Sequence, residues 1–276
     1  MKKINNIEEL KYISNYESDI PYILSGNIWE YDMKQANINC LLSSNYITRE
    51  QYDKLSNYPK YVREKEVGLM ERNDKNIFEI IRHTISEVRH CFLIWNKLNI
   101  DNIIKVSNDA VFVNRPFPVD ITIINHPETH YPFTFVLKNH YTDYINLNGI
   151  LIFININERG QEWEVDVKGI NDNELFLFEA FIGFICKLIQ ALKTGRNNAL
   201  LIYHDFYDKY VSKSLPIEYY REFRSNGTYR ITTKSVKGFD LGIYSPFQEV
   251  PLELLDISYN IYLLRLLYRY IFLEQI

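Results

Sequence analysis

The clearest pattern of hydrophobic and polar positions in the chain lies between Asn76 and Leu98. Hydrophobic side chains recur there at steps of three and four residues, at Ile77, Ile80, Ile81, Ile85, Val88, Phe92 and Trp95. This spacing predicts an α-helix with one apolar face. Further helices are predicted at Ala36–Leu42, Leu175–Thr194 and Leu252–Phe272, and another begins after Thr48, a good N-cap residue.

Short β-prone runs bounded by turn residues predict a sheet. The segment Ile103–Asn114 indicates two strands joined by the polar turn Ser107-Asn108-Asp109. A hairpin with the turn Asn226-Gly227 is expected between the last two helices. Other strands are predicted at Tyr22–Tyr31, Asp120–Asn125, Phe133–Lys138, Gly149–Asn157 and Trp163–Lys168. A mainly antiparallel sheet backed by helices, followed by a helical C-terminal part, predicts an α+β fold.

The composition is that of a globular protein. Hydrophobic residues make up 46% of the chain and charged residues 24%, which is too apolar for disorder. The net charge of −4 gives no overall basic character, so any contact with nucleic acid must come from a local patch. The three widely spaced cysteines predict buried thiols in a reducing compartment. Without an apolar signal core or membrane-length apolar run, we expect a cytoplasmic protein.

Two aspartates stand where a sheet could hold a metal ion. Asp32 ends a β-prone run before a helix, and Asp109 lies in the turn between two strands. Hard cations such as Mg²⁺ take oxygen ligands on rigid elements beside an open face. Transfer of a nucleotidyl group uses two such ions about 3.5–4 Å apart. Each aspartate also has a plain structural interpretation, since Asp32 can cap a helix and Asp109 can be a turn residue.

Around these aspartates the chain resembles family B DNA polymerases, a group that includes many viral replicases. The family motif Asp-Phe-x-Ser-Leu-Tyr-Pro is matched by Asp32–Ile38 through the aspartate and its strand-to-helix setting. Asn37 stands where the family has its sugar-sensing tyrosine. The motif Tyr-Gly-Asp-Thr-Asp-Ser aligns with Lys105–Ala110, in which Ser107 replaces the first aspartate and Asp109 keeps the second.

Three weaker matches follow the same order as in the family. Lys60–Gly68 is similar to the fingers-helix motif whose lysine meets the triphosphate, with Arg63 one turn from Lys60. Lys138–Tyr141 is similar to the Lys-Lys-x-Tyr element that grips the primer end. Lys168–Ile170 is similar to a Lys-Gly-Ile element, and the resemblance covers about residues 20–170.

The resemblance implies a palm-like domain at residues 1–170 with vestigial fingers at about 40–75, and a helical thumb-like region at 171–276. It implies a phage or viral enzyme in the host cytoplasm, acting on primer-template and nucleoside triphosphates. Mg²⁺ or Mn²⁺ would be held by Asp32 and Asp109. Nucleotide would be bound by Lys60, Arg63 and Asn37, and nucleic acid by Lys138, Tyr141 and Lys168.

A second basic region lies between Glu218 and Gly238. Basic and aromatic side chains alternate there, a composition that suits phosphates and bases. The candidate nucleic-acid contacts are Arg221, Arg224 and Arg230. A surface hairpin with core-packed aromatics explains the pattern equally well.

Two other functions fit parts of the sequence. Ser107 in place of a carboxylate and the short fingers favour a non-catalytic polymerase-like subunit, bound to replication or transcription proteins. A metal-dependent nuclease of the PD-(D/E)xK kind is suggested by Pro118-Val119-Asp120 and Asp166-Val167-Lys168. The pair His126 and His130 is predicted to lie in a surface loop, because Pro127 opposes the helical spacing that a metal site needs. His83 and His90 are predicted to be solvated.

Overall fold

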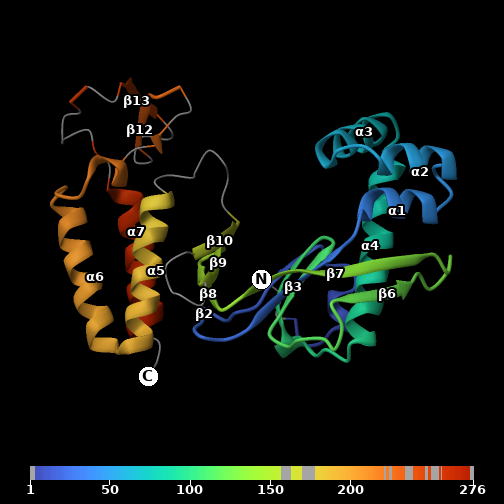
Figure 1. Cartoon of the computed structure of the whole chain (residues 1–276), viewed down its shortest axis with the longest axis horizontal. Helices are drawn as coiled ribbons and strands as arrows, with labels where there is room; N and C mark the ends of the chain where they lie inside the picture. The colour runs from blue at the N-terminus through green and yellow to red at the C-terminus, as the bar shows by residue number, and fades with distance from the viewer. Residues whose placement is uncertain are drawn as a thin grey trace. The chain divides into compact units, whose positions relative to one another are not determined.

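The chain folds into two compact units, one formed by residues 1–20 and 26–141 and the other by residues 21–25 and 142–276. The computed structural model describes residues 4–156, 163–169, 178–220, 222–223, 226–233, 239–245, 248–249, 255 and 257–273 (Figure 1). Antiparallel sheets combine with helices, including a C-terminal helical part, so the predicted α+β class is confirmed. The predicted domain boundary at residue 170 lies outside the described residues.

The first unit is built on a six-stranded antiparallel sheet. Its strand order is β1-β4-β5-β3-β7-β6, so β3 lies inside the sheet between β5 and β7. Alternate residues of β3 face opposite sides of the sheet, which places Asp32 and Tyr31 on different faces. The strands are β1 (Asn15–Glu17), β3 (Ile28–Met33), β4 (Ile103–Ser107), β5 (Ala110–Val113), β6 (Ile121–Asn125) and β7 (Pro132–Tyr141).

One face of this sheet is covered by the long helix α4 (Asn76–Trp95) (Figure 1). Phe92 of α4 is fully buried and stacks on Phe135 of β7, with ring centroids 4.0 Å apart. It also meets Tyr31, whose ring centroid is 5.9 Å away, on the same face of β3. Most of the predicted apolar stripe of this helix therefore packs in the core of the first unit, whereas Trp95, which was predicted to belong to the stripe, is 72% exposed. The opposite face of the sheet carries Asp32.

Three shorter helices lie at one end of α4 in Figure 1. They are α1 (Ala36–Ser43), α2 (Arg49–Ser56) and α3 (Lys60–Asn73). Thr48 caps α2 as predicted, because its side chain accepts a hydrogen bond from the N–H of Gln51 and the Gln51 side chain returns one to Thr48. Single 3₁₀ turns occur at Glu8–Leu10 and Ile100–Asn102 in this unit, and at Ile217–Tyr219 in the second.

The second unit combines a four-stranded sheet, a small three-stranded sheet and three packed helices. The order of the larger sheet is β10-β9-β8-β2, and that of the smaller is β11-β12-β13. Helices α5, α6 and α7 run side by side (Figure 1). The strands are β2 (Tyr22–Ile23), β8 (Asp143–Leu147), β9 (Ile150–Ile156), β10 (Trp163–Lys168), β11 (Glu222–Phe223), β12 (Tyr229–Thr233) and β13 (Phe239–Tyr244). The helices are α5 (Phe178–Thr194), α6 (Arg196–Val211) and α7 (Ser258–Tyr268), and α7 continues into a π-helical turn at Arg269–Leu273.

None of the helices in the described ranges combines the length and the apolar character needed to cross a lipid bilayer.

Candidate carboxylate site

The structure brings Asp32 and Asp109 together at one end of the six-stranded sheet. Asp32 lies directly opposite Ala110 in the pairing of β3 with β5. The next residue along β3, Met33, donates its N–H to the carbonyl oxygen of Asp109 at 3.2 Å. Asn108 adopts a left-handed backbone conformation, with φ of 47°, which closes the tight turn between β4 and β5. Asp32 on β3 thus lies beside the β4–β5 turn that carries Asp109, although the two aspartates are far apart in the sequence.

The surroundings of the Asp109 carboxyl favour its protonated form. Burial raises the pKa of Asp109 to about 6, and the negative charge of Asp32 adds to this effect. The positive charges of Lys138 and Lys60 act in the opposite direction on the same carboxyl. Asp109 is therefore a partly buried carboxylate that is only fully charged above pH 6.

Lys138 and Glu30 are the charged neighbours of Asp32. The Lys138 Nζ lies 3.1 Å from Oε1 of Glu30 and 3.4 Å from Oδ2 of Asp32. Burial alone would lower the pKa of Lys138, but the carboxylates of Glu30 and Asp32 raise it above its ordinary value. Lys138 therefore stays charged at neutral pH and compensates the negative charge of both carboxylates.

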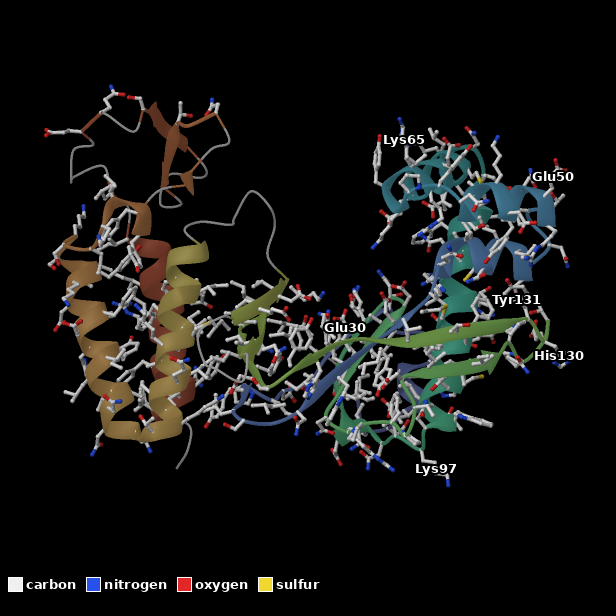
Figure 2. All side chains as sticks on the ribbon, viewed as in Figure 1. Glu30, Glu50, Lys65, Lys97, His130 and Tyr131 are labelled. Carbon is white, nitrogen blue, oxygen red and sulfur yellow. The ribbon has the colours of Figure 1, made fainter. Side chains whose placement is uncertain are left out.

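Glu30 is 1% exposed on β3, within the six-stranded sheet (Figure 2). Besides Lys138, it accepts hydrogen bonds from Nδ2 of Asn139 at 2.6 Å and from the hydroxyl of Tyr141 at 2.9 Å. Tyr141 is buried, and the hydrogen bond from its hydroxyl holds the Glu30 carboxylate in place. Its predicted contact with nucleic acid stays a prediction.

The predicted nucleotide-binding residues come from the helices next to the site. Lys60 is the first residue of α3, and its exposed ammonium lies 3.7 Å from Oε1 of Glu64. The positive charge of Lys60 also lowers the pKa of Asp109. Arg63 follows one turn later on α3 and is half-buried. Asn37 is half-buried in the first turn of α1. Of Lys60, Arg63 and Asn37, Lys60 is the residue whose charge acts on the carboxyl of Asp109.

The remaining predicted contacts belong to the second unit. Lys168 lies on β10, with its Nζ 2.6 Å from Oδ2 of Asp166 on the same strand. Arg230 lies on β12, and Arg221 and Arg224 are outside the described residues. Asp120 directly precedes β6 in the first unit, so the carboxylates of the suggested nuclease motif are divided between the two units.

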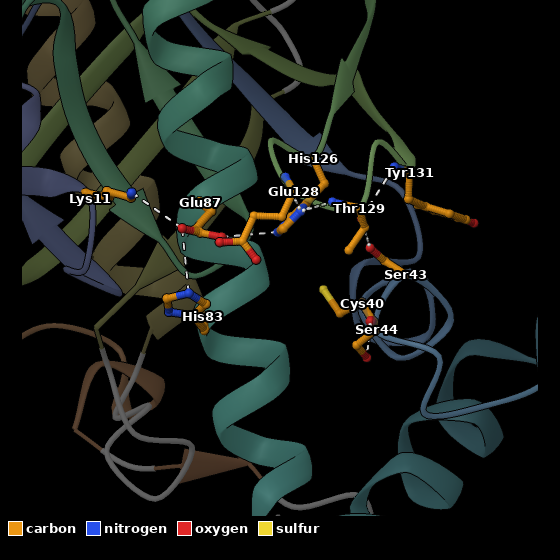
Figure 3. A network of polar contacts seen from close by, with 10 residues as sticks. All are labelled: Lys11, Cys40, Ser43, Ser44, His83, Glu87, His126, Glu128, Thr129 and Tyr131. Atoms are coloured by element: carbon orange, nitrogen blue, oxygen red, sulfur yellow. Dashed lines mark hydrogen bonds and ion pairs between the residues drawn. The ribbon is translucent and has the colours of Figure 1, made fainter.

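His126 is buried, and its prediction as a surface-loop residue is wrong. It is 4% exposed beside α4, where its Nε2 lies 3.2 Å from Oε2 of Glu87 (Figure 3). Its Nδ1 accepts the backbone N–H groups of Glu128 at 3.3 Å and Thr129 at 3.2 Å. The ring proton must therefore sit on Nε2, facing Glu87, which leaves no ring nitrogen free to bind a metal.

Among the described residues, no group of three or more histidine, cysteine, aspartate or glutamate side chains is arranged to hold a metal ion. Asp32 and Asp109 form a pair of neighbouring carboxylates. Mg²⁺ is commonly held in this way, by one or two carboxylates with waters and substrate phosphates completing its octahedral shell.

Replacing His126 with glutamine is expected to destabilise the first unit by about 1–3 kcal/mol at pH 8, because two backbone N–H groups lose their acceptor. Burial lowers the pKa of His126 below its ordinary value, so the wild-type protein itself loses stability as the pH falls below about 6.5. The difference between the two proteins should therefore shrink at pH 5. Urea unfolding at both pH values measures it, and a difference that is larger at pH 5 would be inconsistent with a neutral buried imidazole.

His90 is also buried, and the prediction that it is solvated is wrong. It is 7% exposed, and its Nε2 lies 3.0 Å from Oε2 of Glu8. The neighbouring Arg89 is 1% exposed. His83 is exposed, and its Nε2 lies 3.6 Å from Oε1 of Glu87. A segment near the N-terminus covers this side of α4, which sequence periodicity does not reveal.

The fold and the site define an α+β protein with two paired carboxylates at one end of an antiparallel sheet. The chain belongs to the Bacteriophage PBS1 gene 130 protein family, whose model matches residues 5–244. It is therefore a phage protein, as the resemblance to viral replicases had implied. No curated protein matches the chain.

This membership corrects the family suggested by the sequence motifs. No polymerase family model matches the chain, so the assignment to the family B DNA polymerases is wrong. The five motif matches were short and shared only one to three residues each. An aspartate at a strand end and a Lys-Gly pair at a turn satisfy general requirements of charge and backbone geometry, which unrelated proteins also meet.

Proposed function

We propose that the first unit catalyses nucleotidyl transfer that depends on a divalent cation, with Asp32 and Asp109 as the protein ligands of that cation. The observation that carries this proposal is the position of the two aspartates, since Asp32 lies opposite Ala110 and the N–H of the next residue, Met33, donates to the carbonyl oxygen of Asp109 at 3.2 Å. Burial raises the pKa of Asp109, and the nearby charge of Asp32 adds to this effect. Two carboxylates on neighbouring strands repel each other. A bound cation would relieve the part of this repulsion that Lys138 and Lys60 leave uncompensated.

When bound, Mg²⁺ or Mn²⁺ would neutralise the negative charge that develops on the phosphate of the transferred nucleotidyl group. Lys60 is suited to hold the phosphates of the incoming nucleotide, because its ammonium is exposed and acts electrostatically on Asp109. Lys138 keeps Asp32 in place through the 3.4 Å contact and offsets part of the negative charge of the site. Positioning and charge then account for catalysis, and no general acid or base is needed.

The partners that this function requires are nucleoside triphosphates and a primer-template. The proposed nucleic-acid contacts are Lys138, Lys168, Arg221, Arg224 and Arg230. The buried Tyr141 would contribute only indirectly, by holding the Glu30 carboxylate that pairs with Lys138. Because the chain belongs to a phage family, we place its activity in the cytoplasm of the infected cell.

Primer extension in Mg²⁺ or Mn²⁺ tests the proposal. Asp32→Ala is expected to lower the rate by at least about 10²-fold, because one of two cation ligands is lost. Asp205→Ala serves as the matched control, since Asp205 is an exposed aspartate on α6 that is paired with Lys209. Equal extension by wild type and Asp32→Ala would end the proposal. Nicking of plasmid DNA that survives Asp32→Ala and is lost in Asp166→Ala would instead support a nuclease.

One observation favours a second function, that of a non-catalytic subunit in a phage replication or transcription assembly. The Lys138 ammonium already lies 3.4 Å from Asp32 and 3.1 Å from Glu30, so it neutralises the carboxylates without a metal ion. This function predicts that the wild-type protein binds no Mn²⁺ and associates stably with another replication or transcription protein. It further predicts that Lys138→Met, which removes the competing charge, gains Mn²⁺ binding.

A further inference from the structure

The loop between β6 and β7, residues 126–131, is folded around the imidazole ring of His126. This residue is 4% exposed, and its Nδ1 accepts the backbone N–H groups of Glu128 at 3.3 Å and Thr129 at 3.2 Å. The backbone N–H of His126 donates to the carbonyl oxygen of Tyr131 at 2.9 Å, which closes the loop at its base. One ring nitrogen thus organises the tip of this hairpin.

The hydrogen bonds of the loop require a neutral ring at His126. A neutral imidazole has one acceptor nitrogen, whereas an imidazolium donates at both of its nitrogens. A proton on Nδ1 would point at the N–H groups of Glu128 and Thr129 and would leave both without their acceptor. Protonation of His126 is therefore incompatible with the hydrogen bonds that shape the loop.

Glu87 of α4 is the carboxylate next to the ring, and two other groups share it. Its Oε2 lies 3.2 Å from Nε2 of His126, whereas its Oε1 lies 3.4 Å from Nζ of Lys11 and 3.6 Å from Nε2 of His83 (Figure 3). Lys11 already compensates part of the negative charge of Glu87. Because Glu87 contacts the ring at Nε2, it does not replace the acceptor that the loop loses when Nδ1 is protonated.

The same loop also reaches α1, the helix that follows β3. The hydroxyl groups of Thr129 and Ser43 are hydrogen-bonded at 2.7 Å, and the Tyr131 hydroxyl donates to Oδ1 of Asn39 at 2.9 Å (Figure 3). Asn39 in turn donates its side-chain amide to the carbonyl oxygen of Lys34 at 2.7 Å. The loop is therefore attached to α4 through one set of side chains and to α1 through another.

We propose that residues 126–131 form a proton-operated latch, which is fastened to α4 and α1 while His126 is neutral and opens when its ring takes up a proton from solvent. Opening removes the hydrogen-bond partners of Ser43 and Asn39, both of which are buried in the closed state. The latch does not rest on the proposed function, because neither its closure nor its opening involves a cation or a nucleotide.

The charges around the ring set the direction of the pH response. Burial lowers the pKa of His126 below its ordinary value of 6.5, and the charge of His83 acts in the same direction, whereas Glu87 and Glu128 oppose it. The closed loop thus binds the proton less tightly than the open one, so its stability is fully present above about pH 6.5 and is lost as the pH falls below this value. The titratable groups that surround the ring are Glu87, His83 and Cys91 on α4, Lys11 before β1, and Glu128 in the loop.

Amide hydrogen exchange of the wild-type chain at pH 8 and pH 5, corrected for the intrinsic effect of pH on the exchange rate, tests the latch. Protection of residues 126–131 is expected to fall by about ten- to a hundredfold at pH 5, while the amides of α4 and β4 keep theirs. The fall should share its midpoint with the ¹⁵N signals of the His126 ring. Unchanged protection of the loop, a different midpoint, or an equal loss in α4 and β4 would overturn the proposal.

Three variants assign the proton to one histidine. In His126→Gln the protection of the loop is expected to be low and independent of pH. His130→Gln is the matched control, because His130 is exposed in the same loop, and His90→Gln controls for the other buried histidine of α4, which pairs with Glu8. Both controls should keep the tenfold or larger loss of protection at pH 5. A loss that persists in His126→Gln, or that disappears in either control, would assign the proton to another group and overturn the latch.

Discussion

Asp109→Asn is expected to be more stable than the wild-type protein at pH 8, with a free energy of unfolding about 1–3 kcal/mol higher. The pKa of Asp109 in the folded protein, about 6, lies above its ordinary value of 3.8. The folded state therefore holds the proton more tightly than the unfolded state, and wild-type stability falls as the pH rises from about 4 to about 6. Asparagine cannot ionise, so the variant escapes this loss.

The difference between the two proteins should be fully present above pH 6 and should shrink as the pH is lowered to 4. Urea unfolding at pH 8, 6 and 4 measures it. Asp101→Asn is the control, because Asp101 is exposed in a 3₁₀ turn and its replacement should change stability by less than about 0.5 kcal/mol. An Asp109→Asn variant that is less stable than wild type at pH 8 would contradict the proposed repulsion.

Glu30→Ala is expected to destabilise the first unit by about 1–3 kcal/mol, because partly buried hydrogen-bond donors lose their acceptor. The substitution leaves Lys138 without its nearer carboxylate. It also removes the acceptor of the Asn139 amide and the Tyr141 hydroxyl, both of which lie in the sheet interior.

Glu50→Ala provides the comparison for this variant. Glu50 is an exposed glutamate in the first turn of α2 (Figure 2), so its loss should cost less than about 1 kcal/mol. Thermal and urea unfolding of the two variants measure the contrast. Equal stabilities of Glu30→Ala and Glu50→Ala would show that Glu30 does not organise the interior of the site.

The parts of the fold that the sequence predicted correctly depend on strong local signals. The helix α4 follows from seven apolar residues at helical spacing, and the capping box at Thr48 follows from short-range chemistry. The helix α6 was missed. Its buried side chains Ala199, Tyr203, Phe206 and Tyr210 do recur at helical spacing, but they are mostly aromatic and stand among polar residues. Such aromatic residues favour strands as readily as helices.

The juxtaposition of Asp32 and Asp109 followed from the sequence because both residues end or join predicted strands. Glu30 and Arg89 were missed because charged residues are usually exposed. Signals for both were present. Glu30 lies two residues before Asp32 and so on the same face of β3. Arg89 lies four residues after Ile85 and three before Phe92, which places it within the apolar stripe of α4.

The binding of Mn²⁺, followed by the relaxation of water protons, tests the central claim most directly. Binding to the wild-type chain should strengthen as the pH rises through about 6, where Asp109 becomes charged, and should be lost in both Asp32→Asn and Asp109→Asn. Absence of Mn²⁺ binding to the wild-type chain at pH 8, or equal binding by all three proteins, would contradict a cation site at this pair of carboxylates.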